Sequence, residues 1–356
     1  MFKTDALLFS VAVLFLLSLN GCAAPTTRQA GLDPELVKIE EQKQLQLAIK
    51  KDREYDERLQ RVAWPLLQAA APLCENNTVP RMGFEISTIH AYAKDYQDAA
   101  RVVLGVDDRL RVISVTQGGP AEKAGIESGD IILSVNGEVL PIGKKAIKKF
   151  SGIASDAIAA GPDVSFDLLR DGEKLSITVT GKAVCRFSAQ FSPSDEINAF
   201  ADGNSIYITR GMMRFAQDDQ QLSLVVAHEL AHNSQEHIKA KMKNYWIGAI
   251  FDIAAAAYGA NTQGAFGNMA AGAYSQEFEA EADYVGLYMM ALADIELTGA
   301  ADFWREMGIQ NPGSITKNYA SSHPSTAERY LAIENAVVEI NTKREVGFEL
   351  KPEMKE

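Results

Sequence analysis

Two histidines and a glutamate stand close together in one apolar stretch of the chain, His228-Glu229-Leu230-Ala231-His232. Residues four apart share one face of an α-helix, so both imidazoles can point the same way. One metal ion could then take a nitrogen from each at about 2.0–2.1 Å, the usual Zn–N distance. Glu229 would lie beside a water molecule at that metal and could accept its proton. The chain has five histidines, and two of them fall in this pattern, which favours a zinc site over two helix histidines without metal.

The third ligand of such a site should come from a later acidic segment, Gln276–Asp283, because a catalytic zinc needs three protein ligands and an open position. In this segment the chain resembles the HtpX-type and CAAX-prenyl-protease-type metallopeptidases, which are gluzincins with the pattern Glu-x-x-Ala-Asp. The resemblance implies that Glu279 is the ligand, whereas an error of frame would put Glu281 there. Asp283 shares the helix face of Glu279 and could orient a zinc-bound histidine. Glu277 and Glu281 lie out of phase with Glu279 and are expected in solvent.

Three further segments match the pattern of these gluzincins. Asn198–Ala201 matches the edge strand beside the cleft, which would hold the substrate backbone. Ile206–Met213 matches the segment before the zinc helix, and Ser322–Arg329 matches the late His-Pro…Arg motif. The resemblance covers about Val62–Leu73 and Phe187–Val338, and a segment of another kind interrupts it.

Three single residues have roles that the pattern leaves open. His323 could approach the zinc site, gating its open position or stabilising the oxyanion, or it could fix the turn before the last helix. Arg329 is expected to pair with a carboxylate near the site, and Asp283 is the candidate. His237 lies five residues after His232, about 140° around a helix with about 100° per residue. We therefore predict that His237 faces elsewhere and is structural.

Helices must position most of these residues. A long helix is predicted over Asp219–Lys243, because Asp218 can cap it and Gln221 follows three residues later. Strands are predicted at Phe187–Phe191 and Ser205–Thr209. Further helices are predicted over Gln276–Ala293, Ala300–Met307 and Ser325–Val338.

A charged helical stretch precedes these elements, starting at Asp33-Pro34 and reaching about Leu73. Its first part, Glu35–Arg61, has only a thin apolar stripe, which favours a solvated spacer helix. Val62–Leu73 is more apolar and is expected to pack on the main domain.

Another segment, Trp246–Tyr274, is rich in alanine and glycine. Its apolar part, Ile247–Ala257, contains Asp252 and is too short to span a bilayer. We expect a buried or lid-forming segment there rather than a membrane helix.

Short β-like runs fill the chain from about Val79 to Lys182. At their centre, Gly118–Gly137 reads GGPAEKAGIESGDIILSVNG, which resembles PDZ domains of the bacterial protease-associated type. Such domains bind an extended peptide as an added strand and capture its terminal carboxylate in a loop. By order along the chain that loop is Arg81–Phe84, with Leu104–Val106 as a weaker candidate. The alternative is a PDZ fold kept as a spacer without ligand.

The predicted strands of this segment are Arg111–Val115, Asp130–Val135, Val164–Arg170 and Leu175–Thr180. Arg170–Glu173 contains Asp-Gly, a strong hairpin signal. Ser87–Ala100 would be an insertion before the next strand.

The N-terminus has the pattern of a targeting signal. Lys3 precedes the apolar run Ala6–Leu19, which has the length of a signal-peptide core and is short for a transmembrane helix. Leu19–Cys22 then resembles a bacterial lipobox, in which Cys22 becomes the lipid-bearing first residue. The alternatives are an ordinary signal peptide cut nearby or a lone anchor helix. No aspartate follows Cys22, which favours the periplasmic face of the outer membrane.

Export implies an oxidising compartment. After Cys22, only Cys74 and Cys185 remain, and they stand just outside the two ends of the PDZ-like segment. PDZ termini lie near one another, so a disulfide there would pin the insert at its neck. The alternative is two buried, unpaired thiols.

The composition is that of a globular protein, with 47% hydrophobic residues, and the net charge of −12 argues against nucleic acid as a partner. We predict an α+β protein with a mainly helical gluzincin metallopeptidase domain that has a small β-sheet, plus an inserted β-rich PDZ domain. The predicted boundaries are 1–21 for a lipoprotein signal peptide, 22–78 for an N-terminal helical segment, 79–184 for the PDZ domain, 185–343 for the zinc metallopeptidase domain and 344–356 for a C-terminal tail.

The resemblance implies a zinc-dependent endopeptidase that hydrolyses unfolded or misassembled exported proteins. Its PDZ domain would assist the capture of polypeptide C-termini, and the lipid on Cys22 would tie it to a membrane. The expected zinc ligands are His228, His232 and Glu279, and the expected catalytic residues are Glu229, Asp283 and His323. The alternative is a periplasmic chaperone or binding protein with latent proteolysis.

Overall fold

A computed structural model of the chain describes residues 27, 30–74, 77–257, 261–272, 275–310 and 326–354. The predicted signal peptide, Cys22 and His323 lie outside these residues. No helix among the described residues is long and apolar enough to cross a membrane. Residues 1–44 and residues 45–356 form two units, and each is described by itself.

The N-terminal helix α2 (Pro34–Ala69) is packed from Leu45 onward. Ile49, which is 7% exposed, lies in a small apolar cluster of the insert with Ile89, and Leu59 is fully buried in the core of the main domain. The predicted solvated spacer over Glu35–Arg61 is therefore wrong from Leu45 on. Residues far along the chain pack on the thin apolar stripe of this helix and bury part of it.

The insert carries a six-stranded sheet with the order β2-β3-β4-β6-β7, and β5 pairs with β4. Its strands are β2 (Phe84–Ser87), β3 (Arg111–Val115), β4 (Ile131–Val135), β5 (Glu138–Val139), β6 (Asp163–Arg170) and β7 (Glu173–Thr180). Its main helices are α3 (Gln97–Leu104), α4 (Pro120–Ala124) and α5 (Ala146–Ala160). The β6–β7 hairpin turns at Asp171 and Gly172, whose φ angles of 49° and 88° suit a tight Asp-Gly turn. The predicted strands and hairpin are confirmed.

The two ends of the insert meet at a neck. Strand β1 (Thr78–Arg81) pairs antiparallel with β8 (Lys182–Cys185). A disulfide joins Cys74 and Cys185 across a Cα–Cα distance of 5.7 Å. The predicted bridge is thus present, and closing a loop of this length stabilises the fold by about 4–5 kcal/mol in the chain-entropy model.

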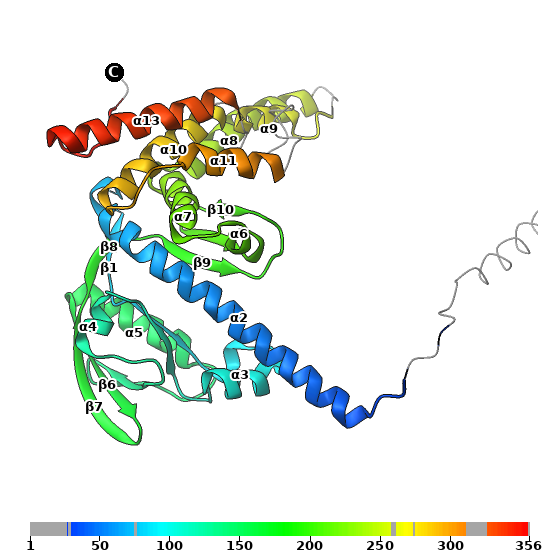
Figure 1. Cartoon of the computed structure of the whole chain (residues 1–356), viewed down its shortest axis with the longest axis vertical. Coiled ribbons are helices and arrows are strands. Elements are labelled where there is room, and N and C mark those ends of the chain that lie inside the picture. Colours follow the sequence, from blue (N-terminus) through cyan, green and yellow to red (C-terminus); the bar gives the residue numbers. More distant parts are fainter. Residues whose placement is uncertain are drawn as a thin grey trace, which may run out of the picture. The chain divides into compact units, whose positions relative to one another are not determined.

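The main domain contains a three-stranded sheet and a set of helices (Figure 1). In the sheet, β11 (Ser205–Thr209) pairs parallel with β9 (Ser188–Ser192) and antiparallel with β10 (Ala199–Ala201), so β10 lies at an edge. The helices that follow are α6 (Arg210–Phe215), α7 (Asp219–Ser234), α8 (His237–Ala257), α9 (Ala265–Gly272), α10 (Ser275–Leu292), α11 (Ala300–Gln310) and α13 (Ala327–Val346). Helix α7 contacts both the strands β10 and β11 and the helix α10.

Helix α7 is shorter than the sequence predicts. It begins as expected, with the Asp218 side chain accepting a hydrogen bond from Gln221 N at 2.8 Å. It ends at Ser234, however, and the chain turns through Glu236, whose φ of 56° is left-handed. The single helix predicted over Asp219–Lys243 is wrong for this reason, and α8 starts in a new direction at His237.

Helix α8 also differs from expectation in its burial. Its Trp246 and Phe251 are 61% and 60% exposed. The prediction that Trp246–Tyr274 is a buried segment is therefore wrong for these side chains of α8.

Candidate metal centre

Two helices bring the candidate metal ligands together. His228 and His232 lie on α7, and Glu279 lies on α10. The helices approach closely at Gly286, where an added Cβ would lie 3.1–3.2 Å from backbone atoms of Ala227 and His228. A larger side chain would push the helices apart, so this glycine helps to set the distance between the glutamate and the histidines.

The three side chains converge on one small space. The Nε2 atoms of His228 and His232 lie 3.1 Å apart, and each lies 3.3 Å from one carboxylate oxygen of Glu279. All three residues are at most 2% exposed, and Glu229 beside them is 2% exposed as well. Their ligand atoms lie within 4.8 Å of one another, so the group could hold one metal ion. Two imidazoles and a carboxylate are a donor set that suits Zn²⁺.

A buried ion pair stands behind His228. The Oδ1 of Asp283 lies 2.9 Å from His228 Nδ1, and it also accepts a hydrogen bond from Arg329 Nη2 at 2.8 Å. Arg329 Nε donates to the other oxygen of Asp283 at 2.5 Å, and the guanidinium lies over the ring of Trp304 at 4.8 Å. The structure thus places Asp283 and Arg329 together, as the sequence suggested for this pair. With Nδ1 of His228 donating to Asp283, its Nε2 lone pair is directed at the ligand cluster.

The charges in this pair explain the direction of two pKa shifts. Burial alone would raise the pKa of Asp283, but the Arg329 charge and the hydrogen bonds from Arg329 and His228 hold it below its usual value. Burial alone would lower the pKa of His228, but Asp283 and Glu279 raise it to about 9. Because metal ligation needs a neutral imidazole, metal binding at this cluster would compete with protonation of His228.

Comparison with known families gives a match for the segment that holds this cluster. Residues 174–337 match the profile described as peptidase family M48. This matched segment contains all three candidate ligands and is called the M48 domain below. Residues 80–180 match the profile of a PDZ domain. Together the matches and the structure confirm the predicted fold class, a mainly helical peptidase domain with an inserted β-rich PDZ domain.

Named relatives agree with the M48 match. The mitochondrial metalloendopeptidase OMA1 of Schizosaccharomyces pombe is 28% identical over 183 residues, which cover 49% of this chain and 53% of that protein. The beta-barrel assembly-enhancing protease of Escherichia coli is 30% identical over 112 residues, which cover 27% of this chain and 23% of that protein. The matched part thus spans about half or less of each relative. These names agree with the predicted enzyme class, a metalloendopeptidase, whereas the finer likeness to HtpX-type and CAAX-prenyl-protease-type enzymes stays a prediction.

A solved structure is similar to the insert alone. The PDZ domain of HtrA3 bound to a phage-derived ligand is 20% identical to this chain, over 30% of this chain and 88% of that one. Its TM-score is 0.22, which is too low to support an argument about the ligand.

The sequence did not predict the positions of two residues near the cluster, and His237 is one of them. Because the chain turns after α7, its Nδ1 lies 2.9 Å from Nδ1 of His232, and its Nε2 lies 3.1 Å from Glu281 Oε2. The ring stacks on Phe278 with centroids 4.7 Å apart, and it is 1% exposed. Burial lowers the pKa of His237. The predictions that His237 faces away and that Glu281 is merely solvated are both wrong.

Asn233 is the other residue near the cluster whose position the sequence did not predict. It follows His232 and is 3% exposed. Its Oδ1 accepts a hydrogen bond from Gly203 N at 2.7 Å, and its Nδ2 donates to Ser205 O at 3.0 Å. Asn233 therefore fixes the turn between β10 and β11 against α7. No pattern in the sequence marks it, because its partners are recognisable only once the sheet is in place.

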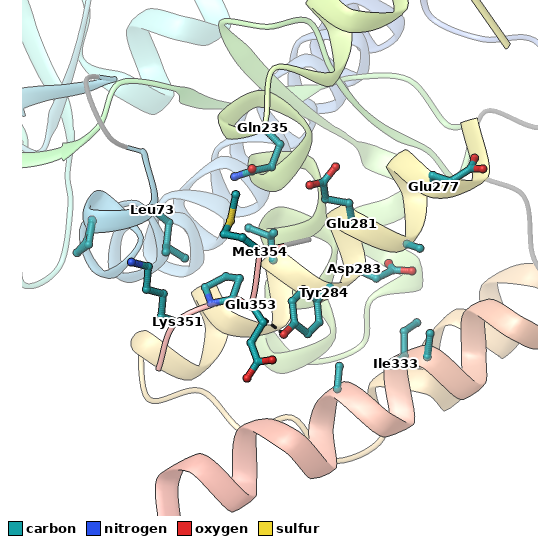
Figure 2. Close-up of a pocket in the computed structure, with 16 residues that line it drawn as sticks. Leu73, Gln235, Glu277, Glu281, Asp283, Tyr284, Ile333, Lys351, Glu353 and Met354 are labelled. Atoms are coloured by element: carbon teal, nitrogen blue, oxygen red, sulfur yellow. Dashed lines mark hydrogen bonds between the residues drawn. The ribbon is translucent and has the colours of Figure 1, made fainter. Parts of the chain in front are cut away.

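A cavity of about 690 Å³ adjoins the same helix α10 (Figure 2). It is lined by Glu277, Glu281 and Asp283 together with residues of the C-terminal tail, including Met354. The tail is held there in part by a hydrogen bond from Glu353 N to the Tyr284 hydroxyl at 3.2 Å. None of the three candidate metal ligands lines this cavity. It therefore lies beside the cluster's supporting residues rather than in front of the ligands.

Proposed function

We propose that this chain is a zinc-dependent endopeptidase of a bacterial cell envelope that hydrolyses unfolded or misassembled exported proteins. The observation that carries the proposal is the convergence of His228, His232 and Glu279 beside the buried Glu229 in an M48 domain. The envelope address rests on the lipobox-like sequence that ends at Cys22. The E. coli relative, named for β-barrel assembly, supports that address, and the mitochondrial OMA1 relatives do not distinguish it.

Each residue has a role in this proposal. His228, His232 and Glu279 hold the zinc, which when bound polarises the scissile carbonyl and acidifies water. Glu229 accepts a proton from the attacking water and passes it to the leaving amine. Asp283, held by Arg329, keeps His228 in the tautomer that ligates through Nε2.

The edge strand β10 gives the substrate a place to lie. An extended polypeptide can add to an exposed sheet edge through main-chain hydrogen bonds, and Asn233 holds this edge against the zinc helix. Phe200 of β10 is 42% exposed and stacks on Tyr207, with centroids 4.8 Å apart. His323 is proposed to act near the same site, gating its open position or stabilising the oxyanion.

A proteolysis assay tests the function. The purified protein should cleave an unfolded substrate such as reduced casein. A zinc chelator should stop the cleavage, and added zinc should restore it. Cleavage that persists at full rate after complete removal of the metal would contradict the proposal.

The PDZ domain is proposed to capture substrate C-termini on the edge strand β2, with the preceding loop at Gly83 receiving the carboxylate. Gly83 has a φ of +80°, so a side chain there would strain the backbone, and a peptide comparison is a cleaner test than a substitution. Charge-assisted hydrogen bonds contribute about 1.5–3 kcal/mol each. An apolar peptide with a free C-terminus should therefore bind at least tenfold more tightly than its amidated twin.

The comparison uses fluorescence anisotropy on the Glu229→Gln chain, so that the peptides stay intact. Equal affinity for the two peptides would mean that the insert does not recognise chain ends.

His237 is expected to support zinc binding through His232. If His232 ligates through Nε2, its Nδ1–H donates to His237 Nδ1, and His237 Nε2–H then donates to Glu281. His237→Phe keeps a ring on Phe278 but removes the acceptor, and loss of such an outer partner typically lowers metal affinity about 10–100-fold. His237→Asn keeps an acceptor near the Nδ1 position and should retain most of the affinity.

Zinc affinity should be measured by competition with a chelating dye, together with the melting temperature of the metal-free protein. His90→Phe is the matched control, because His90 also pairs with a carboxylate, Asp108, but lies in the insert. Equal zinc affinity in His237→Phe and the wild type would show that this contact does not support the site.

A further inference from the structure

Helices α8 and α9 form a closely packed pair within the M48 domain (Figure 1). They touch at Gly248, where an added Cβ would lie 2.2 Å from the Phe266 carbonyl oxygen. Asp252 of α8 caps the start of α9, accepting hydrogen bonds from Phe266 N at 3.2 Å and Gly267 N at 2.8 Å. Asp252, the one acidic residue of the two helices, therefore bonds within the pair. The side of α8 that carries Gly248 and Asp252 faces α9, and we call the opposite side of the pair its outer face.

The outer face of the pair is strongly apolar. Met242, Trp246, Ile250 and Ile253 follow one another at helical spacing, so they share one side of α8. The exposed large apolar residues of the pair are Met242 (52%), Trp246 (61%), Ile247 (52%), Ile250 (63%), Phe251 (60%), Ile253 (68%), Phe266 (39%) and Met269 (68%). The rings of Phe251 on α8 and Phe266 on α9 lie with their centroids 6.3 Å apart, which joins the exposed residues of the two helices. Joined apolar surface of this kind marks a binding surface rather than chance exposure.

The charges around this face are basic. Lys239, Lys241 and Lys243 lie in the first two turns of α8, and Asp252 is the only acidic residue in α8 and α9. Lys239 forms an ion pair with Glu236 in the turn before the helix, and the basic run continues beyond it. This local excess of positive charge contrasts with the net charge of −12 for the whole chain. Lysines at the end of an apolar face and an exposed tryptophan on it are features that helices lying in a membrane interface share.

We propose that the outer face of α8 and α9 binds the surface of an anionic phospholipid bilayer. The apolar side chains would enter the region between headgroups and acyl chains, and Lys239 and Lys243, which lie on the same side of α8 as Trp246, would contact the lipid phosphates. The face would lie on the membrane and not cross it, since no described helix is suited to span one. A lipid surface fits better than an acidic protein partner, because the lysines are confined to one end and most of the face is hydrocarbon. This binding is independent of a lipid on Cys22 and of catalysis.

Vesicle flotation tests the proposal with the predicted mature chain, residues 22–356, carrying Cys22→Ser. This chain lacks both the apolar run Ala6–Leu19 and the candidate lipid site, and every described residue is unchanged. The protein should float with vesicles of phosphatidylglycerol and phosphatidylcholine, and less with phosphatidylcholine alone. Trp246 gives a direct signal, because Trp64 and Trp304, the other tryptophans of the chain, are 8% and 6% exposed. The tryptophan emission should therefore shift to shorter wavelength on binding.

Two variants and a control separate the contributions. Trp246→Ser combined with Ile250→Ser should weaken vesicle binding at least tenfold. Lys239→Glu combined with Lys243→Glu should remove the preference for the anionic vesicles. The control Leu331→Ser with Val338→Ser changes two exposed apolar residues of α13, 58% and 66% exposed, and should bind like the parent. Casein cleavage without vesicles and the melting temperature should stay unchanged in all variants.

Three results would overturn the proposal. The first is an absence of flotation with either vesicle. The second is a dimer in solution that the Trp246 and Ile250 substitutions dissociate, which would assign the face to a second copy of the chain. The third is a raised KM for casein in that variant without vesicles, which would assign the face to the substrate. A failed proteolysis assay would leave these lipid measurements unaffected, so the two proposals fail separately.

Discussion

Glu279→Gln is expected to leave the purified protein with little zinc, where the wild type carries about one ion per chain. The carboxylate lies 3.3 Å from both His228 Nε2 and His232 Nε2, so a neutral amide there replaces an anionic ligand by a much weaker one. His228→Ala and His232→Ala should have the same effect. Metal content by mass spectrometry is the measurement, and proteolysis should be lost in parallel.

Glu281→Gln is the matched control for this experiment. It makes the same chemical change two residues further along α10, at a side chain that is about half exposed and contacts His237. Its amide oxygen can still accept the hydrogen bond from His237, so most of the zinc should remain. Full zinc in Glu279→Gln with loss in Glu281→Gln would mean that the ligand frame on α10 is wrong.

Glu229→Gln should lower kcat by orders of magnitude while leaving zinc in place. Glu229 is buried next to His228, and in the proposed mechanism it transfers the proton and is not a metal ligand. Loss of a general acid–base group lowers rates by about 10²–10⁴-fold, so kcat should fall by that factor on unfolded casein. The metal content and melting temperature of the variant should match those of the wild type.

The same variant separates the endopeptidase from the alternative, a periplasmic chaperone or binding protein. A chaperone would suppress aggregation of unfolded clients, and its cellular phenotype would be identical with Glu229 and with Gln at this position. Wild-type function in cells that carry Glu229→Gln would favour the chaperone, and loss of function would favour the protease.

Local patterns predicted much of the candidate site. The four-residue spacing of His228 and His232 and the apolar residues around them suffice to place both on one helix face. The resemblance to gluzincins pointed to Glu279 and Asp283, and the structure brings both to His228. Short β-like runs and the Asp-Gly turn likewise predicted the strands of the insert, because these signals lie within a few neighbouring residues.

The errors arose where distant contacts override local preference. Nothing near Glu236 requires a helix to end, since neither glycine nor proline is present, and a left-handed residue other than glycine costs about 1–2 kcal/mol. Burial of His237 between His232 and Phe278 offsets that cost. These contacts cannot be predicted from the residues next to Glu236. The spacer prediction for α2 failed for the same reason, because the residues that cover Ile49 lie far along the chain.

The neck between β1 and β8 also bears on the order in which the chain folds. Helix α2 shares its core with β9 and β11, yet the whole PDZ domain separates them in sequence. Bringing such distant segments together costs closure entropy, and long-range contacts of this kind slow folding. An insert that folds first holds Cys74 and Cys185 with their Cα atoms 5.7 Å apart, so α2 then meets its sheet across a short effective loop. The insert would thus act as a folding template for the peptidase domain that it interrupts, and mutations that slow its folding would delay the assembly of the candidate metal site.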